Sequence, residues 1–215
     1  MIFVLTLMLG SAAFAQVAAT EPASPAAAVP PILDQENILY LDLSTGGRVA
    51  IQLFPLIAPN HVERIKTLTR RGFYDGIVFH RVIDGFMAQA GDPTGTGTSG
   101  SDLPDLKAEF NAYPHVRGAV SMARTEDPDS ANSQFFIVFY PRFTLDRKYT
   151  VFGRVTAGMQ HVDAITRGEP PANPSRIVQA SIAADNKPLP AKLSAPAVVA
   201  QPPVTADDLN VPISN

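Results

Sequence analysis

The chain has 215 residues, of which 46% are hydrophobic and 17% are charged, and its net charge is −3. This composition supports a full hydrophobic core, and its mildly acidic charge argues against nucleic acid as a partner. The chain has no cysteine, which excludes disulfides, thiolate metal sites and cysteine nucleophiles.

The two ends of the chain differ in composition from its middle. Residues 1–15 combine an apolar run with small residues, which is the pattern of a secretory signal peptide cleaved after Ala15. A buried N-terminal helix or a membrane anchor is the alternative, although the run is too short to span a bilayer. Residues 16–34 and 185–215 are rich in Ala and Pro, which predicts a linker and a disordered tail. One domain, 35–184, is expected between them.

The domain is predicted to begin with a β-hairpin and a helix. Two β-rich apolar runs, 37–44 and 48–54, flank the turn residues 45–47. A helix is predicted to start at Pro59 and to end at Gly72. Its spacing of apolar residues predicts that a set of basic residues faces outward: Arg64, Lys66 and Arg70.

The rest of the domain is predicted to be mainly β. Five strands are expected at 77–82, 86–90, 119–123, 134–139 and 150–155, followed by a helix at 159–166 and a last strand at 177–183. Many short strands with only two helices favour a closed, eight-stranded antiparallel β-barrel capped by two α-helices over alternating βαβ units.

Several residue patterns could indicate other chemistries. Gly95, Gly97 and Gly100 fit G-x-G-x-x-G, but loop residues follow where a dinucleotide site needs a helix, so we predict a surface loop. The four histidines lack ligand spacing, so no metal site is predicted. Ser121 and Ser133 lack a nucleophile elbow, which argues against serine hydrolase chemistry.

The block around Arg81 is the least usual part of the domain. Alternation along a strand would place Phe79, Arg81 and Ile83 on one face. A cation among apolar side chains is costly unless it has a partner or a function. His80 is expected to be a semi-buried structural residue. From the residues alone, the block fits either plain barrel core or a functional site.

Five segments of the domain decide between these readings. They are, in chain order, FHRVIDGFMAQAGD, AEF, GAVSMAR, NSQFFI and LDRKYTVFGRV. Over residues 37–183 the chain resembles cyclophilin-type peptidyl-prolyl cis–trans isomerases, and its predicted signal peptide makes it similar to secreted, periplasmic bacterial members. The resemblance implies an enzyme without cofactor or metal ion that acts on proline-containing, unfolded or flexible polypeptides. We therefore expect a periplasmic monomer that contacts neither nucleic acid nor, after signal cleavage, a membrane.

The resemblance also implies roles for named residues. Arg81 is the expected catalytic residue, and Gln89 is expected to hold it and to touch the substrate. The expected substrate-binding residues are Phe86, Met87, Ala123, Arg124, Gln134, Phe136, Leu145 and Tyr149. Arg124 stands where the family often has Asn, and Tyr149 where it commonly has His. Thr144 replaces a Trp of many eukaryotic members, so the resemblance does not extend to tight cyclosporin binding, and cyclosporin sensitivity stays open.

Two other functions remain open at this point. The same fold could serve as a proline-peptide-binding chaperone module whose catalysis is dispensable. The chain could also be an interaction protein that docks through its Pro/Ala-rich ends.

Overall fold

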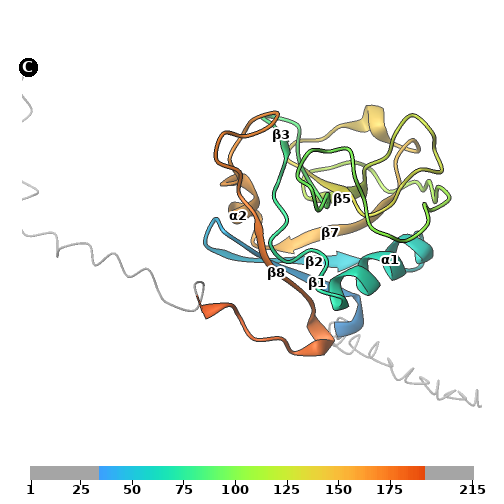
Figure 1. The fold of residues 1–215 in the computed structure, drawn as a ribbon. Coiled ribbons are helices and arrows are strands. Elements are labelled where there is room, and N and C mark those ends of the chain that lie inside the picture. Colours follow the sequence, from blue (N-terminus) through green and yellow to red (C-terminus); the bar gives the residue numbers. More distant parts are fainter. Residues whose placement is uncertain (1–33, 192–215) are drawn as a thin grey trace, which may run out of the picture. The chain divides into compact units, whose positions relative to one another are not determined.

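The computed structural model describes residues 34–191, which form one antiparallel sheet with two α-helices (Figure 1). The predicted signal peptide, most of the linker and most of the tail lie outside this range. The strands are β1 (Ile38–Leu43), β2 (Gly47–Leu53), β3 (Arg81–Ile83), β4 (Met87–Ala90), β5 (Ala119–Met122), β6 (Phe135–Val138), β7 (Val151–Ala157) and β8 (Ile177–Ile182). The helices are α1 (Pro59–Arg70), α2 (Met159–Asp163) and the short 3-10 turns η1 (Gln35–Asn37), η2 (Phe143–Leu145) and η3 (Ala183–Asp185).

The sheet has the strand order β3-β4-β6-β5-β7-β2-β1-β8, so β3 and β8 are its two edges. Isolated backbone hydrogen bonds join the chain near these edges, including Phe79 N–H to Ser175 O at 2.9 Å and Val82 N–H to Gly168 O at 2.8 Å. They do not form a ladder between β3 and β8. The mainly β, antiparallel fold is confirmed, whereas the closure of the expected barrel is not.

The residues before β8 explain why these edges remain unpaired. Pro170, Pro171 and Pro174 have no N–H to donate, so the segment 168–176 cannot form a continuous ladder with the segment before β3. The curled sheet therefore stays open in its hydrogen bonding at this edge.

Neither helix among residues 34–191 is long and apolar enough to cross a membrane.

Most predicted elements occur with ends shifted by one or two residues, but the predicted strand 77–82 is reduced. Only β3 is regular there, because the preceding residues form isolated bridges. Alternation consequently fails: Phe79 is fully buried in the interior, whereas Arg81 is exposed. The predicted second helix is also shorter and ends at Asp163. Beyond it, the N–H of Ile165 donates to the carbonyl oxygen of Val162, three residues back, which is the 3-10 pattern and not the α-helical one.

Helix α1 packs its apolar face on the core but differs from expectation at Arg64. The guanidinium of Arg64 is buried and donates to the carbonyl oxygens of Pro104 (2.6 Å) and Asn132 (3.2 Å). Burial lowers the pKa of Arg64. The prediction that Arg64 faces outward is therefore wrong, because two loops that are distant in sequence cover this side of the helix.

The side chains of the sheet sort into two apolar clusters, one on each face. The interior cluster takes residues such as Ala88, Val120, Phe135, Ile137 and Phe152. The outer cluster takes their chain neighbours Met87, Ala119, Phe136, Val138 and Val151. Because successive side chains on a strand point to opposite faces, β4, β5, β6 and β7 contribute to both clusters. The outer cluster forms the floor of the candidate site.

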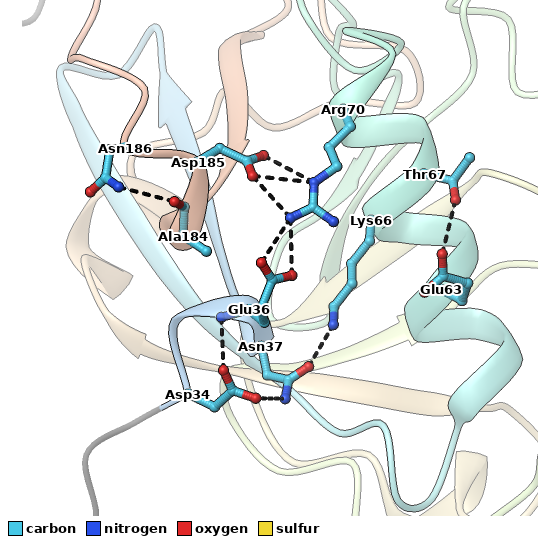
Figure 2. Close-up of polar contacts among 10 residues, drawn as sticks. All are labelled: Asp34, Glu36, Asn37, Glu63, Lys66, Thr67, Arg70, Ala184, Asp185 and Asn186. Atoms are coloured by element: carbon cyan, nitrogen blue, oxygen red, sulfur yellow. Dashed lines mark hydrogen bonds and ion pairs between the residues drawn. The ribbon is translucent and has the colours of Figure 1, made fainter.

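Both ends of the domain are fastened to α1. Figure 2 shows Arg70 between Asp185 of η3 and Glu36 of η1, with ion pairs of 2.9 and 3.0 Å. The side-chain amide of Gln179 in β8 also donates to the carbonyl oxygen of Pro188 at 2.9 Å. The first residues after 184 thus contact the domain, although the sequence places the start of the tail there.

Candidate functional site

A groove of about 860 Å³ lies on the outer face of the sheet. Nine of the ten predicted site residues line it: Arg81, Phe86, Met87, Gln89, Ala123, Arg124, Phe136, Leu145 and Tyr149. The tenth, Gln134, lines an adjoining pocket of about 520 Å³. The structure therefore gathers residues from four of the five quoted segments around one groove.

The register of four strands aligns the centre of the groove. Arg81 of β3 lies opposite Gln89 of β4, Gln89 opposite Phe136 of β6, and Phe136 opposite Ser121 of β5. Directly opposed residues of antiparallel strands project to the same face. A cationic, an amide and an aromatic side chain thus stand in one row across the sheet.

The guanidinium of Arg81 is half-exposed and has a carboxylate partner. Its Nε–H donates to Oε2 of Glu169 at 2.8 Å, and the side chains of Arg81 and Glu169 are 45% and 50% exposed. Glu169 and Pro170 belong to the loop between α2 and β8 and line the groove. Sequence reasoning does not identify Glu169, since 88 residues separate it from Arg81 and no local motif marks it.

The glycine-rich segment is a loop, as predicted, and it forms one wall of the groove. Buried Asp92 holds it by accepting hydrogen bonds from the backbone N–H groups of Thr94 (2.7 Å), Gly97 (2.6 Å) and Ser99 (3.2 Å). The hydroxyl of Thr94 also donates to Asp92, at 2.8 Å. Burial by itself raises the pKa of Asp92, but the hydrogen bond from this hydroxyl and those from the backbone outweigh it and lower the pKa to about 2. Gly97 has φ +85°, which favours glycine at this position.

An aromatic and aliphatic wall closes the other side of the groove. Phe136 is 5% exposed and meets the ring of Tyr149 edge-on, with centroids 5.7 Å apart. Arg124 stacks its guanidinium over Tyr149 at 4.6 Å and donates to the carbonyl oxygen of Lys148 at 2.9 Å. The side chain of Arg124 thus supports the wall.

A buried histidine lies behind this wall. His115 stacks on Phe136 with ring centroids 6.2 Å apart, contacts Asp146 Oδ1 through Nδ1 at 2.8 Å and meets Ser121 Oγ through Nε2 at 2.9 Å. Burial lowers the pKa of His115. The neutral ring with its proton on Nδ1 can donate to Asp146 and accept from Ser121.

Ser121, His115 and Asp146 have the connectivity of a Ser–His–Asp triad, but Ser121 is fully buried, so no substrate can reach its hydroxyl.

Ser133 is also fully buried and donates to the carbonyl oxygen of Gly91. His80 is 6% exposed, and part of it borders the groove. Among residues 34–191, no three His, Cys, Asp or Glu side chains gather into a possible metal site.

Comparison with known proteins places this groove in a family. The model for cyclophilin type peptidyl-prolyl cis-trans isomerases matches residues 40–182. A probable peptidyl-prolyl cis-trans isomerase of Brucella suis biovar 1 is 48% identical over 170 residues, which cover 72% of this chain and 86% of the relative. This chain belongs to the cyclophilin family.

Further cyclophilins agree in sequence and fold. Peptidyl-prolyl cis-trans isomerase B of Bacillus subtilis is 41% identical over 131 residues, covering 60% of this chain and 91% of that protein. A crystal structure of a cyclophilin from Hirschia baltica has a TM-score of 0.67 and 33% identity, covering 73% of this chain and 77% of that chain. A Cryptosporidium parvum cyclophilin, solved in the presence of the dipeptide Ala-Pro, has a TM-score of 0.64 and 26% identity, with coverages of 67% and 98%.

Proposed function

We propose that this cyclophilin accelerates rotation about X–Pro peptide bonds and so assists the folding of proline-containing polypeptides. The observation that carries the proposal is the row of Arg81, Gln89 and Phe136 across a groove large enough for a peptide. The uncatalysed barrier is about 18–20 kcal/mol and reflects C–N resonance. No bond breaks in this reaction, so the site needs neither a nucleophile nor a cofactor.

Arg81 is the proposed catalytic residue. In the twisted amide the resonance is lost, so the nitrogen regains its lone pair and becomes an acceptor. A guanidinium that stays charged can donate to this nitrogen and to a nearby carbonyl oxygen. Such hydrogen bonds gain strength in a partly dry groove and favour the twisted amide over the planar one. Gln89, which faces Arg81 across the strands, is proposed to hold the guanidinium and to touch the substrate.

The apolar wall is proposed to hold the proline ring while the other side of the bond turns. Its side chains are Phe86, Met87, Phe136, Leu145 and Tyr149, all of which line the groove. The N–H of Ala123 already donates to the carbonyl oxygen of Gln134 at 2.9 Å. The backbone of Arg124 is therefore proposed to bind the residue before proline in an extended conformation.

A protease-coupled isomerisation assay on an Ala-Pro peptide tests this function. It uses the chain from Gln16 onward, its Arg81→Ala and Arg81→Lys variants, and the control Arg154→Ala, which removes an exposed arginine outside the groove. We expect kcat/KM to fall by about a hundredfold or more in Arg81→Ala and to stay unchanged in the control. An inactive wild type that still binds proline peptides would instead indicate a binding module.

We also propose that the mature protein is a periplasmic monomer with one domain, 35–184, between a linker and a Pro/Ala-rich tail. The signal-peptide pattern of residues 1–15 supports the location, and the ion pair of Arg70 with Glu36 supports the start of the domain. Asp185, which pairs with the same arginine, lies one residue beyond the proposed end of the domain. N-terminal sequencing of the exported protein should begin at Gln16. Light scattering should give the mass of one mature chain.

A further inference from the structure

The loop before β8 brings a carboxylate to the proposed catalytic arginine. Gly168 and Val82 exchange two backbone hydrogen bonds, of 2.8 and 2.9 Å, so the loop is fixed beside β3. A Cβ atom on Gly168 would lie 2.6 Å from Cα of Pro171, so only glycine fits this close approach. Glu169 directly follows Gly168, as Arg81 directly precedes Val82. The backbone pairing therefore places the two charged side chains together.

The ion pair of Arg81 uses the arginine differently from the similarly exposed pair between Arg117 and Asp163. Arg117 donates to Asp163 through both terminal nitrogens, at 3.0 and 2.6 Å. Arg81 donates to Glu169 through Nε, and within residues 34–191 its terminal nitrogens make no further hydrogen bond. Glu169 thus fixes one edge of the guanidinium and leaves the donors of the other edge available.

We propose that Glu169 is a positioning residue for Arg81: it holds the guanidinium by Nε so that both terminal nitrogens can donate to the bound X–Pro amide. This inference rests on the proposed function. An unrestrained arginine samples many rotamers and must be ordered when the twisted amide forms. An arginine already held at Nε loses less freedom at that moment, so the contact lowers the barrier more than it strengthens substrate binding.

The contact of Glu169 with Arg81 could also have the opposite effect on catalysis, which the same experiment detects. A carboxylate beside the guanidinium also reduces its positive field, so Glu169 could instead attenuate catalysis. Removal of Glu169 would then raise kcat. The single contact at Nε favours positioning, because the terminal N–H groups keep their full hydrogen-bonding capacity.

The test compares Glu169→Ala and Glu169→Gln with wild type in kcat and KM on an Ala-Pro peptide. We expect Glu169→Ala to lower kcat by about fivefold with KM changed less than about twofold. Glu169→Gln should lie between, because its amide oxygen can still accept from Nε. The control Asp163→Ala removes the carboxylate of the similarly exposed pair with Arg117, outside the groove, and should leave kcat unchanged.

A double-mutant cycle separates positioning from other effects. Because the role acts through Arg81, Glu169→Ala should have no further effect on the residual rate in an Arg81→Ala background. The NMR signal of the Arg81 Nε–H should also exchange faster with water in both Glu169 variants. If Glu169→Ala lowers the melting temperature markedly, Glu169→Gln supplies the kinetic comparison.

Three results would overturn the inference: an unchanged kcat, a raised kcat, or an effect that persists without Arg81. A wild type without isomerase activity would overturn the proposed function instead, so the two failures are distinguishable.

Discussion

Oε1 of Gln134 accepts a hydrogen bond from Nε2 of Gln89 at 2.9 Å. Nε2 of Gln134 donates to the carbonyl oxygens of Gly97 (3.1 Å) and Ser99 (2.8 Å). Because carbonyl oxygens only accept, this arrangement fixes the orientation of both glutamines. The Nε2 group of Gln89 is turned to Gln134, which leaves Oε1 of Gln89 as an acceptor for Arg81 or the substrate. Asp92, by holding the loop, holds this series of contacts.

The first prediction concerns Gln134. Gln134→Glu keeps the size of the side chain but replaces the donor to Gly97 and Ser99 with a negative oxygen. The loop and Gln89 should then lose their fixed orientation, and we expect kcat/KM to fall by about tenfold. Gln160→Glu makes the same exchange at an exposed position of α2 and should have no effect. Equal rates for the two variants would contradict the proposed role of Gln134.

The second prediction concerns the support of Tyr149 by Arg124. Arg124→Ala removes the stacking over the ring and the hydrogen bonds to Lys148, so the wall should bind the proline ring less well. We expect KM to rise about threefold, with kcat nearly unchanged. Arg124→Lys should not restore KM, because an ammonium group lacks the planar face that stacks. Steady-state kinetics on the Ala-Pro peptide measures both, and full rescue by Lys would exclude a stacking role.

The third prediction is a flat pH profile. Burial lowers the pKa of both histidines at the site, His80 and His115, which favours their neutral forms near neutrality. The carboxyl of Asp92, with a pKa of about 2, is already ionised. We expect kcat/KM to vary little between pH 6 and 8 in the isomerisation assay. A bell-shaped profile within this range would indicate acid–base chemistry and contradict the mechanism.

The fourth prediction follows from the lowered pKa of Asp92. Its pKa is about 2 in the folded chain against an ordinary value of 3.8, so its contribution to stability is complete above pH 4 and is lost as the pH falls through 2. That contribution is about 2 kcal/mol. Asp92→Asn should therefore be less stable than wild type at pH 7, and the difference should shrink toward pH 2. Thermal unfolding across this range measures it, and a difference independent of pH would contradict the linkage.

The fifth prediction concerns the start of α1, which has no side-chain cap on Ala58. Glu109 replaces that cap by accepting from the backbone N–H groups of Asn60 and His61, both at 3.1 Å. Glu109→Ala should lower the free energy of unfolding by about 1–2 kcal/mol. Glu63→Ala, at an exposed position of the same helix, is the control. Equal losses in a denaturant titration would show that Glu109 has no special role.

Local patterns predicted much of this protein. Apolar, β-rich runs predicted the strands, and Pro59 predicted the start of α1, because these signals depend on neighbours a few residues apart. The segments around Arg81, Phe136 and Tyr149 indicated the family, and the structure places nine of ten predicted site residues around one groove.

The errors have a common origin in contacts between distant segments. Alternation around Phe79 fails because isolated bridges to residues near β8 replace a regular ladder. Arg64 turns inward because the carbonyl oxygens of Pro104 and Asn132 lie within its reach. Closure of the barrel depends on whether the edges β3 and β8 can form a hydrogen-bonded ladder. The prolines before β8 prevent this, because the fold brings them opposite the segment before β3.

The sequence by itself determined which side chains could perform the chemistry, because a motif fixes residue types and their local spacing. Only the tertiary structure decided which partners set their orientation. Glu169 reaches Arg81, and Asp146 reaches His115, through pairings between segments 88 and 31 residues apart. Such pairings arise from strand register and loop paths, and hydrogen bonding between elements fixes these only when the whole sheet is assembled.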